Sequence, residues 1–107
     1  MKNVGGMLKS IMDLQKKMDS IQKEIAEKSF EGDSAGGLVK LEMTGKGEVT
    51  KLVIDPEVLK EDAETVSDLV VVALNSAYNK KEAFSKEKLA SVSAGLLPLG
   101  LKLPGLG

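Results

Sequence analysis

The chain has 107 residues, of which 42% are apolar and 29% charged, so we expect one domain with a modest core and no extensive disorder. It contains neither cysteine nor histidine, which excludes disulfides and thiolate chemistry and removes the commonest general base and metal ligand. The net charge of −1 is unevenly divided: residues 1–28 carry +2, residues 29–75 carry −6, and residues 76–107 carry +3. Every cation is a lysine, and no apolar run is long enough to span a membrane. We therefore expect a soluble, cytoplasmic protein.

The first predicted element is a helix that begins near residue 4 and ends near Lys28. Its apolar residues recur at alternating spacings of three and four, which is the a/d pattern of a coiled coil held for about three heptads. So narrow a stripe favours pairing with a second copy, although a helix packed on the core of its own domain would show a similar stripe. The residues of this apolar stripe are Val4, Met7, Ile11, Leu14, Met18, Ile21 and Ile25.

Three strands are predicted between residues 28 and 54. Residues 28–33 form a short first strand, and a turn-rich stretch follows it. In residues 38–44, Val39, Leu41 and Met43 alternate with polar residues, which is typical of a half-buried strand. Residues 48–54 form another strand, so the sequence predicts a three-stranded antiparallel meander.

The glycine-lysine-glycine sequence at residues 45–47 is the nearest approach to a catalytic motif. A phosphate-binding loop needs a helix directly after the lysine, and here a strand follows instead. We therefore expect a hairpin in which Gly45 and Gly47 supply positive φ angles and Lys46 is a solvated tip.

Asp55 and Pro56 predict the start of a second long helix, with Asp55 as its N-cap and Pro56 in the first helical position. Gly95 is the expected end of this helix. Residues 1–95 would then form a single domain. Residues 96–107, rich in leucine, proline and glycine, are expected to be a mobile tail.

Residues 69–74 of the second helix are apolar on every side. A helix of this kind is buried on every side, so we expect the sheet to cover one face and another chain or helix to cover the other. Leu69, Val70 and Ala73 are accordingly candidates for a dimer interface, together with the apolar stripe of the first helix.

Three lysines on the second helix, Lys80, Lys81 and Lys88, have no acidic residue three or four positions away on either side. Lys81 and Lys88 nearly align, so a basic stripe is predicted. Such a stripe favours contact with phosphate, although lysines near a helix C-terminus also complement its dipole. On the first helix, by contrast, three acids each stand four residues before a lysine, as on an ordinary solvated face.

The sequence shows no arrangement of catalytic or metal-binding residues. Glu61, Asp62 and Glu64 cluster where a helix is expected to begin, and acids are favourable there because of the helix dipole. Ser91 and Ser93 have no histidine to activate them. We therefore expect no enzymatic activity, metal, cofactor or small-molecule substrate.

Four segments, "GGLVK" (36–40), "IDP" (54–56), "DLVVVALNSA" (68–77) and "KLASVSAG" (88–95), followed by the tail, resemble the YbaB/EbfC family of bacterial nucleoid-associated proteins. The resemblance covers nearly the whole chain. It implies an α+β fold in which a long N-terminal helix, a three-stranded sheet and a long C-terminal helix form an intertwined homodimer. Projecting helices of this dimer would grip double-stranded DNA in the cytoplasmic nucleoid.

Family members often carry arginine where this chain has Lys80 and Lys81. Lysine retains the charge but lacks the fork that reads base edges, so we expect weak sequence preference. The expected phosphate contacts are Lys80, Lys81 and Lys88, with Lys2, Lys9 and Lys16 as secondary ones. The alternative function is a non-catalytic scaffold dimer that uses the first helix and the apolar tail to bind another protein.

Overall fold

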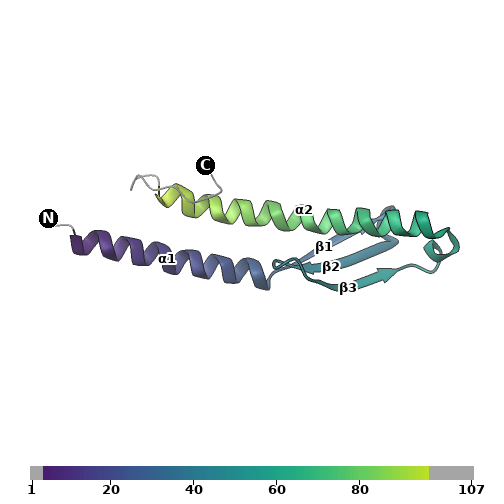
Figure 1. The fold of residues 1–107 in the computed structure, drawn as a ribbon, viewed down its shortest axis with the longest axis horizontal. Helices are drawn as coiled ribbons and strands as arrows, with labels where there is room; N and C mark the ends of the chain where they lie inside the picture. Colours follow the sequence, from purple (N-terminus) through teal and green to yellow (C-terminus); the bar gives the residue numbers. More distant parts are fainter. Residues whose placement is uncertain (1–3, 97–107) are drawn as a thin grey trace. The chain divides into compact units, whose positions relative to one another are not determined.

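The computed structural model describes residues 4–96 (Figure 1). In chain order a long helix, a three-stranded sheet and a second long helix follow one another, as the α+β class predicts, and short 3₁₀ turns η1 (Ala35–Gly37) and η2 (Val58–Lys60) join elements. The main elements are α1 (Val4–Glu27), β1 (Ser29–Ser34), β2 (Val39–Thr44), β3 (Val49–Ile54) and α2 (Ala63–Leu96). The chain divides into two compact units: unit 1 comprises the residues up to Glu24 and from Lys86 onward, and unit 2 is Ile25–Ser85. Lys2 and residues 97–107 of the predicted tail lie outside the described residues.

In unit 2 the three strands form an antiparallel sheet in the order β1-β2-β3, which confirms the predicted meander. The alternation in β2 places Val39, Leu41 and Met43 in the core, where they are between 0% and 3% exposed. The first half of α2 covers this face of the sheet (Figure 1). Polar residues of the same strands lie on the outer face.

Close packing of α2 on the sheet depends on three small residues. Gly32 of β1 pairs with Leu41, and a Cβ added at Gly32 would overlap the backbone oxygen of Ala73 and the backbone of Ala77. Ala73 and Ala77 are themselves fully buried. The absence of side-chain bulk on both sides of this contact allows the helix backbone to lie directly on β1.

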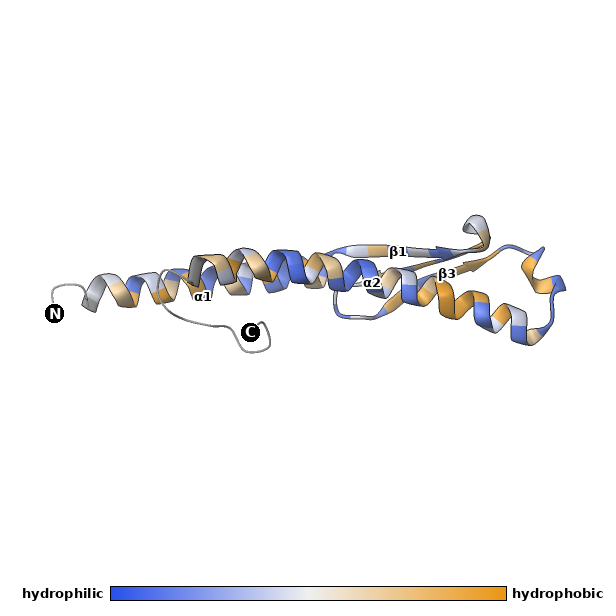
Figure 2. Cartoon of the chain, turned by 90° about the horizontal axis from the view of Figure 1, so that it is seen from above, coloured by the Kyte–Doolittle hydropathy of each residue, from blue (hydrophilic) through white to orange (hydrophobic). Residues whose placement is uncertain are grey.

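Beyond this contact, unit 2 leaves an apolar surface uncovered. Leu52 of β3, on the inner face of the sheet, is 46% exposed, and on α2 Val71 and Val72 are 51% and 53% exposed. Val53, on the outer face of the sheet, is 49% exposed. Figure 2 shows the corresponding hydrophobic colour on both elements. The sheet thus covers one face of residues 69–74, as predicted, and no other part of residues 4–96 covers the opposite face.

The predicted start of the second helix is wrong. Asp55 accepts a hydrogen bond from the Glu57 backbone N–H at 2.9 Å, but this closes a turn that leads into η2. Val58 in η2 is 4% exposed and joins the core, which requires the chain to turn inward before the helix begins.

Asp62 is the N-cap of α2. Its carboxylate accepts a hydrogen bond from the Thr65 backbone N–H at 2.8 Å. The Thr65 hydroxyl and this N–H together hold the pKa of Asp62 below its ordinary value of 3.8. At its other end α2 continues through Gly95 to Leu96, so Gly95 does not end it.

The hairpin between β2 and β3 forms as predicted, but only one of its two glycines, Gly47, has a positive φ angle. Gly47 has a φ of +87°, whereas Gly45 is not in the left-handed region. Gly45 is needed because a Cβ there would overlap the Ile25 carbonyl, and its N–H donates to the Lys28 carbonyl at 3.1 Å. The hairpin therefore packs against the end of α1 instead of projecting freely.

In unit 1, α1 and the last turns of α2 lie side by side (Figures 1 and 2). Val92 of α2 is 1% exposed and Ile21 of α1 is 8% exposed. Part of the apolar stripe of α1 is thus buried within its own chain. This is the alternative that the sequence analysis gave to a coiled coil with a second copy. Ile25, in unit 2, is buried as well, while the side chain of Val4 lies outside what the structure describes.

Candidate nucleic-acid interface

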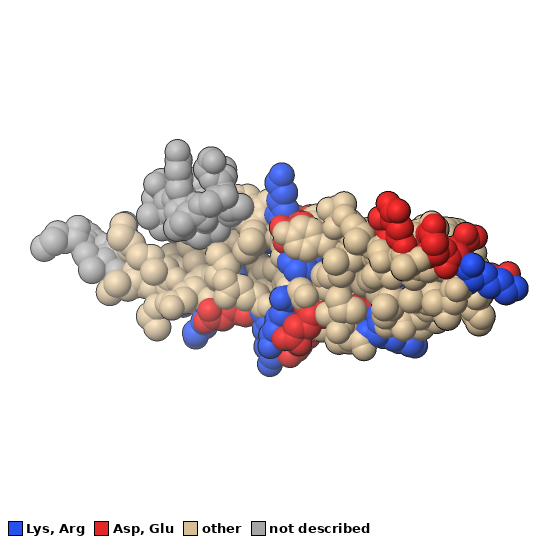
Figure 3. Space-filling view, turned by 45° about the vertical axis from the view of Figure 1, so that its right-hand side comes forward, with Lys and Arg blue, Asp and Glu red and all other residues tan. Residues whose placement is uncertain are grey.

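The two units carry charges of opposite sign. Within residues 4–96, unit 1 has six lysines and four acids, whereas unit 2 has seven lysines and twelve acids. Acidic side chains gather around the start of α2 (red in Figure 3), where Glu57, Glu61 and Glu64 are all exposed. A DNA duplex would be attracted to unit 1 and repelled by most of unit 2.

Lys80 and Lys81 lie in unit 2 and contact their own chain. The Lys80 ammonium donates to the Glu31 carbonyl at 2.8 Å. The Lys81 ammonium pairs with Glu82 at 2.9 Å and stands 5.1 Å from the centre of the Tyr78 ring, and its side chain is only 13% exposed. Binding a phosphate through Lys81 would require these contacts to be exchanged.

Lys88 lies in unit 1, where it pairs with Glu24 of α1 at 3.4 Å. The pair is accessible, since the two side chains are 37% and 51% exposed. Glu24 is one of the three acids of the first helix that stand four residues before a lysine, here Lys28. Lys28 instead lies over the Phe84 ring, with its ammonium 4.9 Å from the ring centre.

Lys9 and Lys16 are exposed on α1 and point away from its apolar stripe. They are seven residues apart, so they align to within about 20° around the helix, roughly opposite Met18. The part of the chain that the structure describes shows no ion pair for either lysine.

Sequence reasoning passed over three further exposed lysines of unit 1: Lys17, Lys23 and Lys86. Glu82, four residues before Lys86, is at the spacing of a pair within the helix, but it pairs with Lys81. The charge of unit 1 as a whole was the available signal, because the sequence already showed basic ends and an acidic middle.

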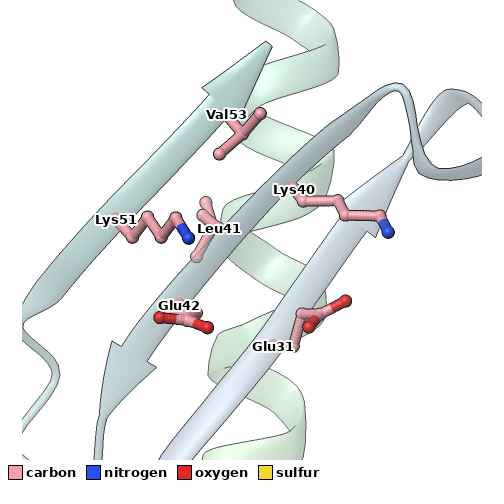
Figure 4. A pocket seen from close by; sticks show the side chains of 6 residues that line it. All are labelled: Glu31, Lys40, Leu41, Glu42, Lys51 and Val53. Atoms are coloured by element: carbon pink, nitrogen blue, oxygen red, sulfur yellow. The ribbon is translucent and has the colours of Figure 1, made fainter. Parts of the chain in front are cut away.

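Two hollows of unit 2 do not suit an anionic ligand such as a nucleotide. A cavity of about 90 Å³ opens on the outer face of the sheet, well below the size of common ligand pockets. Two carboxylates and two ammonium groups surround it (Figure 4), and its lining is Glu31, Lys40, Leu41, Glu42, Lys51 and Val53. A wider hollow of about 390 Å³ has Glu57 and Glu61 on its rim, which disfavours an anionic ligand. Residues 4–96 contain no cluster of potential metal ligands, and neither helix there is long and apolar enough to cross a membrane.

Helix, three-stranded sheet and long helix, with the excess of lysines in unit 1, are the features to be compared with known proteins. The YbaB/EbfC DNA-binding family matches residues 1–96. The nucleoid-associated protein Atu0095 of Agrobacterium fabrum is 45% identical over 106 residues, which cover 97% of this chain and 99% of that protein. The chain therefore belongs to the YbaB/EbfC DNA-binding family, which is a family of nucleoid-associated proteins and not a known enzyme family.

A solved structure has the same fold. The crystal structure of the uncharacterized protein HP0035 from Helicobacter pylori superposes with a TM-score of 0.61 at 26% identity. The superposition covers 76% of this chain and 94% of that one. The family resemblance inferred from four short segments is thus confirmed over nearly the whole chain.

Proposed function

We propose that this protein binds double-stranded DNA as an intertwined homodimer, through phosphate contacts made by the lysines of unit 1. The observation that carries the proposal is the division of charge, with lysines in excess in unit 1 and acids in excess in unit 2. Lysine provides a point charge without the planar fork that recognises guanine, so binding has weak sequence preference. The protein would act in the cytoplasmic nucleoid without a membrane or small-molecule partner.

Within this surface, Lys9 and Lys16 become primary contacts, because they are exposed, aligned and directed away from the apolar stripe. Lys88 can contribute by exchanging Glu24 for a phosphate. Lys80 and Lys81 become secondary, because both already bind groups of their own chain. Lys2 keeps its proposed secondary role.

The homodimer is supported by the uncovered apolar surface of unit 2. Val71 and Val72 lie on the side of α2 that faces away from the sheet, and Leu52 lies on the inner face of the sheet beyond the reach of α2. Leaving such a surface in water is unfavourable, and a second copy supplies an apolar surface of the same kind. Among the predicted interface residues, Leu69 and Val70 are half-buried and can still contact a second copy. Ala73 is already fully buried against the sheet of its own chain.

The proposal is tested by measuring duplex binding against salt for two matched double variants. Lys9→Glu with Lys16→Glu reverses two charges in unit 1, and Lys40→Glu with Lys51→Glu reverses two on the outer face of the sheet. For a dimer the first pair removes four phosphate contacts, so the slope of log K against log salt should become shallower by about 3 to 4. The second pair should leave the slope unchanged.

Circular dichroism and sedimentation would first establish that both variants are folded with the wild-type oligomeric state. Equal losses in the two variants would show that net charge alone matters and would contradict localisation to unit 1. If the wild-type protein bound no duplex DNA at low salt, the scaffold dimer would be the better interpretation.

A further inference from the structure

The two edges of the sheet in unit 2 differ in how they are protected. β1 and β3 are the edge strands, because β2 lies between them. On β1, the Glu31 carbonyl at the outer edge accepts a hydrogen bond from the Lys80 ammonium at 2.8 Å. Within residues 4–96, no comparable contact closes the outer edge of β3. An open edge strand is a template for pairing with another chain.

The hydrogen bonds at the end of β3 show which of its backbone groups are free. Asp55, directly after the strand, donates its N–H to the Leu38 carbonyl at 2.8 Å, which continues the ladder with β2. Backbone direction alternates along a strand, so Val53 also faces β2, whereas Leu52 and Ile54 face outward. The N–H and C=O groups of Leu52 and Ile54 are therefore available to a further strand.

The outer face of β3 presents a cation, an apolar side chain and an anion in a row. Val53 is 49% exposed on a face that otherwise carries mostly charged side chains (Figure 4). By the alternation along the strand, Lys51 and Asp55 belong to the same face, one on each side of Val53. Residues 4–96 show no ion pair for either of them. This row is complementary to its own reverse.

Two antiparallel copies of β3 can pair in only a few registers. Directly opposed residues lie on the same face of a sheet, so the two-fold axis must pass through a residue. An axis at Lys51 would oppose two ammonium groups, and an axis at Leu52 would place Lys51 opposite Val53. An axis at Val53 places Lys51 opposite Asp55 at both ends and the two valines against each other. Of these registers, only the last pairs opposite charges and covers Val53.

We propose that the outer edge of β3 pairs with β3 of a second copy about a two-fold axis at Val53, and that this contact joins one dimer to the next. Leu52 of each copy then exchanges backbone hydrogen bonds with Ile54 of the other. The joining of dimers rests on the homodimer of the proposed function, which uses α2 and the inner face of the sheet instead. Because a dimer carries two β3 edges, repetition of the contact gives a row of dimers.

The contact is short, so it forms most readily between copies that are already concentrated, as on one DNA duplex. It neutralises no phosphate, so it does not alter the salt slope expected for unit 1. Pairing of β3 thus adds affinity between neighbouring dimers without adding a DNA contact.

The test uses the absence of cysteine in the chain. In Val53→Cys the two thiols would belong to a directly opposed pair whose Cα atoms are about 4.5 Å apart, within the range of a disulfide. Mild oxidation should therefore link two chains, as seen by electrophoresis without reductant. The control is Lys40→Cys, opposite Val53 on β2 and on the same face. Its two copies would be about 14 Å apart, or three strand spacings, which is too far for a disulfide.

Sedimentation of the oxidised Val53→Cys protein would show what the disulfide joins. We expect assemblies larger than a dimer, and reduction should return them to dimers. Circular dichroism would verify that each variant is folded.

Charge variants of the Val53→Cys protein test the register. Lys51→Glu places two acids opposite each other at both ends of the pairing, which should slow cross-linking by about fivefold or more. Lys40→Glu makes the same change of charge on β2, away from the axis, and should leave the rate nearly unchanged.

Three results would overturn the proposal and leave the homodimer intact. Cross-linking of Lys40→Cys as fast as that of Val53→Cys would show that the disulfide forms by random collision. Equal slowing by Lys51→Glu and Lys40→Glu would exclude the register. Oxidised Val53→Cys protein that sedimented only as a dimer would show that the edge does not join dimers. A wild type that is monomeric before oxidation would instead contradict the homodimer, and the row of dimers with it.

Discussion

The close contact between β1 and α2 predicts that a glycine-to-alanine substitution destabilises the protein at Gly32 but not at Gly6. In Gly32→Ala, the new Cβ would lie 2.6 Å from the Ala77 nitrogen and 2.8 Å from the Ala77 Cβ. Non-bonded carbon atoms prefer about 3.5 to 4.0 Å, and the new Cβ would overlap the Ala73 carbonyl oxygen more closely still, so α2 must withdraw by at least about 1 Å. Overpacking of this kind typically costs about 1 to 3 kcal/mol, and the withdrawal also weakens dispersion contacts along the core.

Gly6→Ala is the matched control. Gly6 lies in the first turn of α1, and an added Cβ would meet nothing within 4 Å. Alanine is the better helix former by up to about 1 kcal/mol, so this variant should be as stable as the wild type or more stable.

Urea unfolding followed by circular dichroism would measure both variants. Protein concentration must be held constant, because the proposed dimerisation would make apparent stability depend on it. A Gly32→Ala protein as stable as the wild type would refute the close approach of α2 to β1. So would equal destabilisation by Gly6→Ala, since that would point to a general effect of the substitution.

The uncovered surface of unit 2 predicts that Val71→Asp with Val72→Asp shifts the protein towards monomers in sedimentation, while the far-UV spectrum stays helical; an unchanged dimer would exclude this face of α2 from the interface. The lowered pKa of Asp62 predicts a pH-dependent contribution to stability. Because the pKa of Asp62 is lower in the folded state, its ionised carboxylate stabilises the fold. This stabilisation is fully present above the ordinary pKa of 3.8 and is lost as the pH falls through the lowered value. The stability difference between the wild type and Asp62→Asn should therefore be constant above about pH 4 and shrink below it, and a difference that stayed constant to pH 2 would contradict this.

The sheet was predictable because its signal is local. The alternation of Val39, Leu41 and Met43 fixes which face of β2 is buried, and short glycine-containing turns leave few ways to connect the strands. The start of α2 was not predictable from the same kind of signal. Asp55 and Pro56 have the residue types of a helix start, but burial of Val58 in the core decides the path of the chain.

The placement of the lysines depended on information that a single helix does not contain. Ala77 faces the sheet, and Lys81 lies only about 40° from it around the axis of α2. The predicted basic stripe is therefore near the buried side of α2, and the Lys81 side chain is mostly buried. The small residues Ala73 and Ala77 were the available signal for that side. The acidic partner of Lys88 lies on α1, far away in the sequence, where helix spacing rules do not reach.

The chain topology of unit 1 has a consequence for the order of folding. Its two helical segments are joined only through the whole of unit 2, so pairing of Glu24 with Lys88 must close a long loop, whereas the strands are joined by short turns. Folding unit 2 first shortens that loop and removes most of the entropic cost of closing it. By the same reasoning, the helices of unit 1 can separate while the sheet remains folded.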